Sequence, residues 1–233
     1  MARITRKELK TDKFALEVGH TVDFFEEHQT EIFRYGAVVL AVVAIVVIIF
    51  VYRGHQHSVR QEALAKAMAV EDAPVGQAAP GAALSFPTQE TKDKEVSKAF
   101  GELAAKYSGT DEGYIGEYYL GCRAADEGKL GEADKLFSSV ADSAGKRYAS
   151  LAKLSLGQLY FAESKPAQGE QMLRSLIENP TVFVSKDQAT IVLAKMLAPT
   201  KPAEARKLLD PLRAKPGPVS QAAVQAYGEL QSQ

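Results

Sequence analysis

The sequence predicts an all-α protein in which one transmembrane helix precedes a solenoid of antiparallel helical hairpins. Three observations lead to this fold class. The seventeen residues from Gly36 to Tyr52 include no charged side chain. The second half of the chain is rich in Ala, Leu, Glu, Lys and Gln, which favour helix. Within that half, a pattern of small and large apolar residues recurs three times, as expected for a repeat fold.

The composition is that of an ordinary globular chain, and it excludes some classes of protein. The 233 residues include 28 basic and 29 acidic side chains, which leaves a net charge of -1. Nucleic-acid-binding domains usually carry a basic surplus, so no nucleic-acid partner is expected. Cys122 is the single cysteine, so no disulfide can form within the chain.

The apolar segment is predicted to cross a membrane. A helix in a soluble domain carries polar residues on one face, whereas this segment has no polar face. As a helix, residues 35–52 would be about 27 Å long, close to the roughly 30 Å of the hydrocarbon core of a bilayer. Tyrosines at both ends match the aromatic residues that are common at membrane interfaces. The residues assigned to the span are Tyr35, Gly36, Val39, Val43, Val47, Phe50 and Tyr52.

A permanent anchor explains this segment better than a cleaved signal peptide does. The preceding leader is long and carries seven acidic residues, whereas a signal peptide has a short basic start and a shorter apolar stretch. The basic residues leave the orientation open. The basic residues closest to the span favour a cytoplasmic location for the residues that follow the span. When all basic residues of the leader are counted, a cytoplasmic leader is favoured instead.

We therefore divide the chain into four parts. Residues 1–34 form a leader, 35–52 the span, 53–87 a juxtamembrane helix with an Ala/Pro/Gly-rich segment, and 88–233 the repeat domain. That segment, Glu71 to Pro87, contains three prolines and two glycines and is either a linker or an ordered loop. Apolar residues of the leader are spaced as on one face of a helix, which either rests on the membrane or docks a partner. This stripe consists of Phe14, Val18, Val22 and Phe25.

The repeated pattern predicts helix–turn–helix units at 118–140, 154–176 and 191–212. Each has a Leu-Gly or Leu-Ala pair in its first helix, then a small residue and large apolar ones in its second. Small residues let the two helices approach closely, and large ones fill the space against the neighbouring unit. A helix at 94–107 is expected to be half of an incomplete first unit, and one at 219–230 to cap the stack. The residues predicted to pack are Leu120, Gly121, Ala133, Phe137, Leu156, Gly157, Gly169, Leu173, Leu193, Ala194, Ala205 and Leu209.

This pattern resembles the tetratricopeptide repeat, whose usual period is about 34 residues. The first two Leu-Gly pairs lie 36 residues apart, and Glu117 and Lys153 stand where that repeat usually has tryptophan. Repeats of this kind present an extended groove to a peptide or a partner helix. The sequence therefore predicts a protein-binding surface, and the alternative is a helical spacer.

Signals of catalysis or metal binding are weak, and neither an enzymatic activity nor a cofactor or metal is predicted. His55 and His57 could hold a metal, but few acidic residues and no cysteine lie near them in the sequence. Cys122 has no neighbouring histidine and stands where a small buried residue is normal. The phosphate-binding motif GxxxxGKS/T and the nucleophile motif GxSxG are absent.

The layout as a whole resembles the YfgM family, the tetratricopeptide-like ancillary subunits of the bacterial Sec translocon. The similarity lies in a leader before one span, in His55-Gln56 and Ser58-x-Arg60 after that span, and in the segments FGELAAKYSGT and YLGCRAADEGKLGEADKLFSSV. It is most specific from Phe100 to about Leu176. This chain differs in its longer leader and in its Ala/Pro/Gly-rich segment.

The resemblance implies a protein of the bacterial inner membrane with its N terminus in the cytoplasm and its repeat domain in the periplasm. It implies partners among translocon subunits, periplasmic chaperones or exported chains, besides the lipid bilayer. It implies no catalytic residue. The alternative function is an envelope scaffold that organises proteins of division or outer-membrane assembly.

Overall fold

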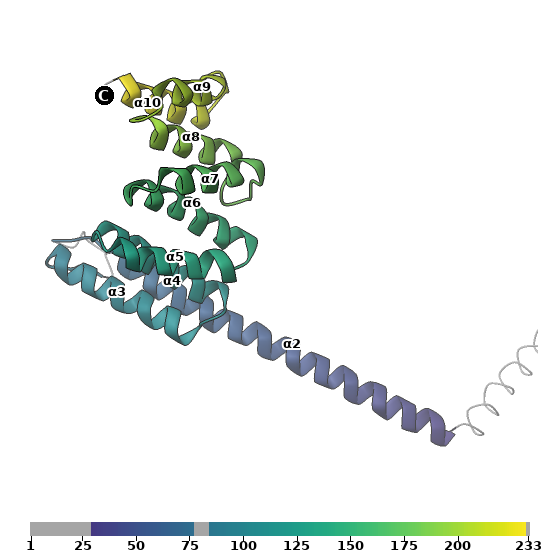
Figure 1. Ribbon diagram of the computed structural model, residues 1–233. Helices are drawn as coiled ribbons and strands as arrows, with labels where there is room; N and C mark the ends of the chain where they lie inside the picture. The colour runs from purple at the N-terminus through teal and green to yellow at the C-terminus, as the bar shows by residue number, and fades with distance from the viewer. Residues whose placement is uncertain (1–28, 77–83, 232–233) are drawn as a thin grey trace, which may run out of the picture. The chain divides into compact units, whose positions relative to one another are not determined.

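The computed structural model describes residues 29–76 and 84–231. These residues form nine α-helices and no β-strand, apart from one isolated bridge between Val75 and Phe86. The predicted all-α repeat fold is therefore confirmed. The predicted leader stripe of Phe14, Val18, Val22 and Phe25 lies outside the described residues. The helices are α2 (Gln29–Asp72), α3 (Gln89–Lys106), α4 (Asp111–Asp126), α5 (Leu130–Ser143), α6 (Lys146–Ala162), α7 (Pro166–Glu178), α8 (Lys186–Leu197), α9 (Pro202–Arg213) and α10 (Pro218–Gln231), labelled in Figure 1.

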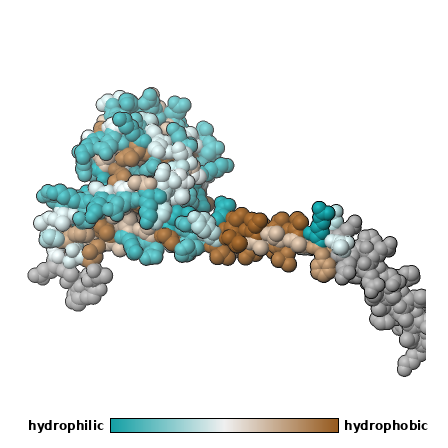
Figure 2. Space-filling model, turned by 90° about the horizontal axis from the view of Figure 1, so that it is seen from below, coloured by the Kyte–Doolittle hydropathy of each residue, from teal (hydrophilic) through white to brown (hydrophobic). Residues whose placement is uncertain are grey.

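The chain divides into two compact units, Met1–Ser58 and Val59–Gln233. In the first unit, α2 carries the apolar segment, whose large side chains from Phe33 to Tyr52 are 49–79% exposed. Figure 2 shows them as a continuous hydrophobic surface. Soluble monomers rarely expose an apolar surface of this extent to water. This helix, with a mean hydropathy of 2.9 in its most apolar window, is long and apolar enough to span a membrane.

The second unit, called the stack below, is a series of helices in which each packs on the next (Figure 1). Contacts also join α4 to α6, α6 to α8 and α8 to α10, whereas no such contact joins α5, α7 and α9 in the described part of the chain. Helices α4, α6, α8 and α10 therefore stand closer together. They form the inner face of the stack, and α5, α7 and α9 form its outer face.

Local signals set the ends of several helices. Thr88, Thr110 and Ser185 each accept a hydrogen bond from the backbone N–H three residues later, which caps α3, α4 and α8. Proline begins α7 and α9, where its missing N–H has no cost. Gly128, in the turn from α4 to α5, has a φ of 74°, a conformation that glycine adopts without strain.

The last turns of α2 pack in the stack as the partner of α3. Ala67 of α2 is buried against Val96, Phe100 and Leu103 of α3. The sequence left open whether this juxtamembrane helix packs or stands free, and the structure shows that its end forms the first hairpin with α3. The base of the connecting Ala/Pro/Gly-rich segment is ordered, because the N–H of Gly76 donates to the C=O of Phe86 at 2.8 Å.

A buried carboxylate joins this first hairpin to α4. The side chain of Glu112 is 2% exposed and accepts hydrogen bonds from Arg60 Nε at 3.1 Å and Gln61 Nε2 at 2.6 Å. Burial by itself would raise the pKa of the Glu112 carboxyl. The hydrogen bonds from its own backbone N–H and from Gln61, together with the charge of Arg60, hold that pKa below the usual value.

Glu112→Gln is expected to lower the free energy of unfolding by about 2 kcal/mol at pH 7, because a hydrogen bond to a charged group contributes about 1.5–3 kcal/mol. The folded pKa lies below the usual 4.5. The carboxylate therefore stabilises fully above that value and ceases to do so as the pH falls through the folded pKa. Urea unfolding of both chains at pH 7 and at successively lower pH tests this. A difference between the chains that does not shrink on acidification contradicts it.

Candidate functional site

The residues predicted to pack between repeats lie at the contacts between successive hairpins. Leu120 packs with the first hairpin, in the cluster around Phe100. Leu156 packs with Ala133 and Phe137 of the preceding hairpin. Leu193 likewise packs with Leu173 of the preceding hairpin, and Ala194, Ala205 and Leu209 share that cluster. Each leucine of a Leu-Gly or Leu-Ala pair thus contacts the hairpin before its own.

The three predicted glycines lie where two helices approach closely. A Cβ at Gly121 would stand 2.7 Å from Cε1 of Phe137, and one at Gly157 would stand 2.8 Å from Cδ2 of Leu173. A Cβ at Gly169 would stand 2.6 Å from the backbone oxygen of Gly157. Atoms of α5, α7 and α6, respectively, therefore crowd a larger residue at these three positions.

Two further glycines of α4 make the same kind of contact and were not among the predicted packing residues. A Cβ at Gly116 would stand 2.9 Å from the backbone oxygen of Phe100, and one at Gly113 would collide with the backbone of Tyr107. Glycine inside a helix costs about 1 kcal/mol relative to alanine. Two glycines three residues apart in one helix were therefore a usable signal of close packing.

The inner face carries a polar contact between two successive hairpins. Tyr118 Oη of α4 and Ser155 Oγ of α6 lie 3.2 Å apart. Burial raises the pKa of Tyr118 to about 12, so this phenol stays neutral.

A pocket of about 270 Å³ opens beside the contact between Tyr118 and Ser155, with Cys122 and Gln158 among its lining residues. Burial raises the pKa of the Cys122 thiol as well, which disfavours the thiolate that a nucleophile requires.

The described residues contain no group of three or more His, Cys, Asp or Glu side chains that could hold a metal ion. His55 and His57 lie on α2 within the first unit, and both are exposed. The structure places no cluster of acidic or cysteine ligands beside them among the residues that it describes.

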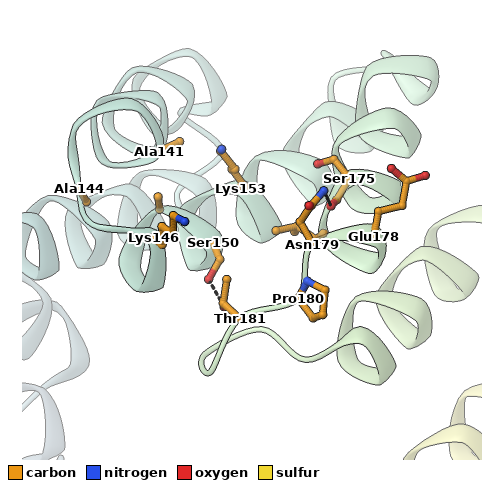
Figure 3. Close-up of a pocket in the computed structure, with 12 residues that line it drawn as sticks. Ala141, Ala144, Lys146, Ser150, Lys153, Ser175, Glu178, Asn179, Pro180 and Thr181 are labelled. Atoms are coloured by element: carbon orange, nitrogen blue, oxygen red, sulfur yellow. Dashed lines mark hydrogen bonds between the residues drawn. The ribbon is translucent and has the colours of Figure 1, made fainter.

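A wider groove, of about 790 Å³, lies between α5, α6 and α7 (Figure 3). One face of α6 forms its floor, the ends of α5 and α7 form its walls, and the loop after α7 closes one end. Within this loop the N–H of Thr181 donates to the C=O of Val184 at 2.9 Å in a turn. The lining residues are Ala141, Ala144, Lys146, Ala149, Ser150, Lys153, Ser175, Leu176, Glu178, Asn179, Pro180 and Thr181.

Hydrogen bonds hold the loop against the floor of this groove. Ser150 Oγ lies 2.7 Å from Thr181 Oγ1 and donates to the C=O of Arg147 at 2.6 Å. Thr181 Oγ1 in turn accepts from the N–H of Val184 at 3.0 Å. Beyond the groove, the ring of Phe183 packs edge-on against Tyr148 at 5.2 Å. These contacts fix the shape of the groove.

Comparison with known proteins adds one family. A model described as a tetratricopeptide repeat-like domain matches residues 32–183, which is more than half of the chain. The matched region includes the apolar segment, the first three hairpins and the loop that closes the groove. No curated protein and no solved structure matches the chain.

Proposed function

Because the chain belongs to the tetratricopeptide repeat-like domain family, we propose that it is a membrane-anchored protein-interaction module that assists protein export beside the Sec translocon. Domains of this family generally mediate contacts between proteins and are generally non-enzymatic scaffolds. The observation that carries the proposal is that one matched region contains both a helix apolar enough to span a membrane and a stack of repeat hairpins. The resemblance to the ancillary subunits of the translocon supports the export role.

In this proposal, residues 1–34 are a cytoplasmic leader, 35–52 cross the bacterial inner membrane, 53–87 follow it, and 88–233 form the repeat domain in the periplasm. The partners are translocon subunits, periplasmic chaperones or exported chains. Apolar side chains of residues 35–52 support the span, because they are exposed without a protein partner among the described residues. The close packing at Gly121, Gly157 and Gly169 supports a rigid stack that presents fixed surfaces to such partners.

The orientation can be tested with single cysteines. Lys135, exposed on α5, is changed to cysteine in a chain in which Cys122, the single native cysteine, is replaced by serine. A membrane-impermeant maleimide added to intact spheroplasts is expected to label this chain. A Thr5→Cys chain in the same background serves as the leader control and should react only after lysis. The reverse pattern would place the repeats in the cytoplasm.

Chemical cross-linking of the full-length chain in its native membrane, followed by mass spectrometry, tests the function. We expect cross-links from the stack to translocon subunits, periplasmic chaperones or exported chains. Cross-links only to proteins of division or outer-membrane assembly would instead identify an envelope scaffold. Absence of any cross-linked protein would contradict the interaction function itself.

A further inference from the structure

We propose that the groove between α5, α6 and α7 binds a short acidic segment of a partner protein, in which an apolar side chain lies between two carboxylates. The inference rests on the proposed interaction function and assigns the chemistry of the partner. It follows from the charges, the floor and the position of this groove.

Two lysines give the groove its charge. Lys146 and Lys153 lie seven residues apart on the same side of α6, which separates them by about 10 Å along the helix axis. Neither ammonium group has a carboxylate within 4.0 Å among the described residues. Glu178 is the one acidic residue that lines the groove, so the lining carries a net positive charge in a chain whose net charge is -1.

The neighbouring hairpins show that an unpaired charge at the position of Lys153 is not a property of every repeat. In the preceding hairpin, Glu117 stands where α6 has Lys153, and it accepts a hydrogen bond from Ser139 of α5 at 2.8 Å. In the following hairpin, Thr190 stands there and donates to the C=O of Lys186 at 2.7 Å. Lys153 alone among the three has no partner within the described chain, which leaves its charge available to a ligand.

The floor of the groove suits an apolar side chain. Ala149 of the floor is buried, as are Ala141 and Leu176 of the walls, and the short side chains of the two alanines leave space within the groove. At one end, α6 begins at Lys146, and the N-cap residue Gly145 provides no side-chain hydrogen bond, so the positive end of the helix dipole adds to the charge of Lys146. A volume of about 790 Å³ lies within the range of ligand clefts and exceeds what a single ion would fill.

The groove lies on the outer face of the stack. Ser155, which contacts Tyr118 on the inner face, is nine residues after Lys146, about half a turn around α6. An acidic segment in the groove therefore leaves the inner face free for a second partner. A peptide in the polyproline II conformation, with three residues per turn and a rise of about 3.1 Å per residue, places carboxylates three residues apart on the same side, about 9 Å from each other, which is close to the spacing of the lysines.

Binding is tested with the purified full-length chain in detergent micelles and the peptide tetramethylrhodamine-Ser-Glu-Ala-Leu-Glu-Ser-amide, whose N-terminal dye is fluorescent. We expect fluorescence anisotropy to rise with protein concentration and the affinity to fall with added salt. The same peptide with glutamine in place of glutamate should bind at least tenfold more weakly. Bound peptide should also protect Lys146 and Lys153 from acetylation, as measured by mass spectrometry.

Charge-reversed chains provide the matched control. Lys146→Glu/Lys153→Glu should weaken binding at least tenfold, whereas Lys135→Glu/Lys207→Glu changes two exposed lysines outside the groove and should not. Lys146→Gln/Lys153→Gln covers the case in which charge reversal prevents folding, and circular dichroism checks each chain. No binding at millimolar peptide, equal binding of the glutamine peptide, or equal binding by a folded groove variant would overturn the proposal. Native cross-links that persist in such a case would leave the interaction function standing and reject only the groove.

Discussion

Gly169→Ala is expected to destabilise the stack by about 2–3 kcal/mol, in the range measured for overpacked cores. The added methyl group would stand 2.6 Å from the backbone oxygen of Gly157. Backbone atoms cannot rotate away as the end of a side chain can, so α6 and α7 must separate. In a unit of this size the melting temperature should fall by roughly 5–10 °C, which circular dichroism of the full-length chain in detergent would measure.

Gly101→Ala is the matched control for this substitution. Gly101 lies inside α3, and an added Cβ would have no atom within 4 Å. Alanine at a free helical position should raise stability by about 0.5–1 kcal/mol, because it restricts the unfolded chain more than glycine does. If Gly169→Ala melted as the unchanged chain does, the close approach of α6 and α7 would be wrong.

Val43→Arg/Val47→Arg is expected to prevent stable insertion of α2 into a membrane. Each arginine near the centre of a span costs about 2.5–3.5 kcal/mol on insertion scales, so the pair costs roughly 5–7 kcal/mol. Both valines lie in the middle of the apolar segment and are more than half exposed, at 54% and 53%. Flotation of cell membranes on a density gradient would show what fraction of each chain remains with the lipid.

Val43→Leu/Val47→Leu keeps the segment apolar and should float with the membranes like the unchanged chain. Flotation separates inserted protein from aggregates, which sediment. An arginine variant that floated to the same extent as the leucine variant would show that α2 does not depend on these residues to hold the chain in the membrane.

Periodic features of the chain were predictable because they depend on neighbours in sequence. The apolar segment was evident from its length and lack of polar residues, and the helical hairpins from the spacing of Leu-Gly pairs, small residues and large ones. The predicted small positions at Gly121 and Gly169 lie against α5 and α6, respectively. Such a pattern can be recognised in a single sequence because each hairpin needs small and large apolar residues at the same helix contacts.

The first hairpin was only half predicted, because its two helices are not related by the repeated pattern. Helix 94–107 was expected, but its partner is the end of α2, across an Ala/Pro/Gly-rich segment. The contact between Arg60 and Glu112 joins residues 52 positions apart in the sequence. No local spacing signals a contact of this kind, since either side chain is equally suited to water at the surface.

The sequence by itself determined the helical class, the phase of the repeats and the presence of a segment apolar enough to cross a membrane. All three depend on the local spacing of apolar and small residues, because that spacing decides which face of each helix is buried away from water. Only the tertiary structure decided that the end of α2 completes the first hairpin and that Glu112 is buried beside Arg60. It also decided that Lys146 and Lys153 share one groove with the ends of α5 and α7. Those features depend on how separate hairpins pack, and packing between hairpins joins residues whose distance in the sequence carries no signal.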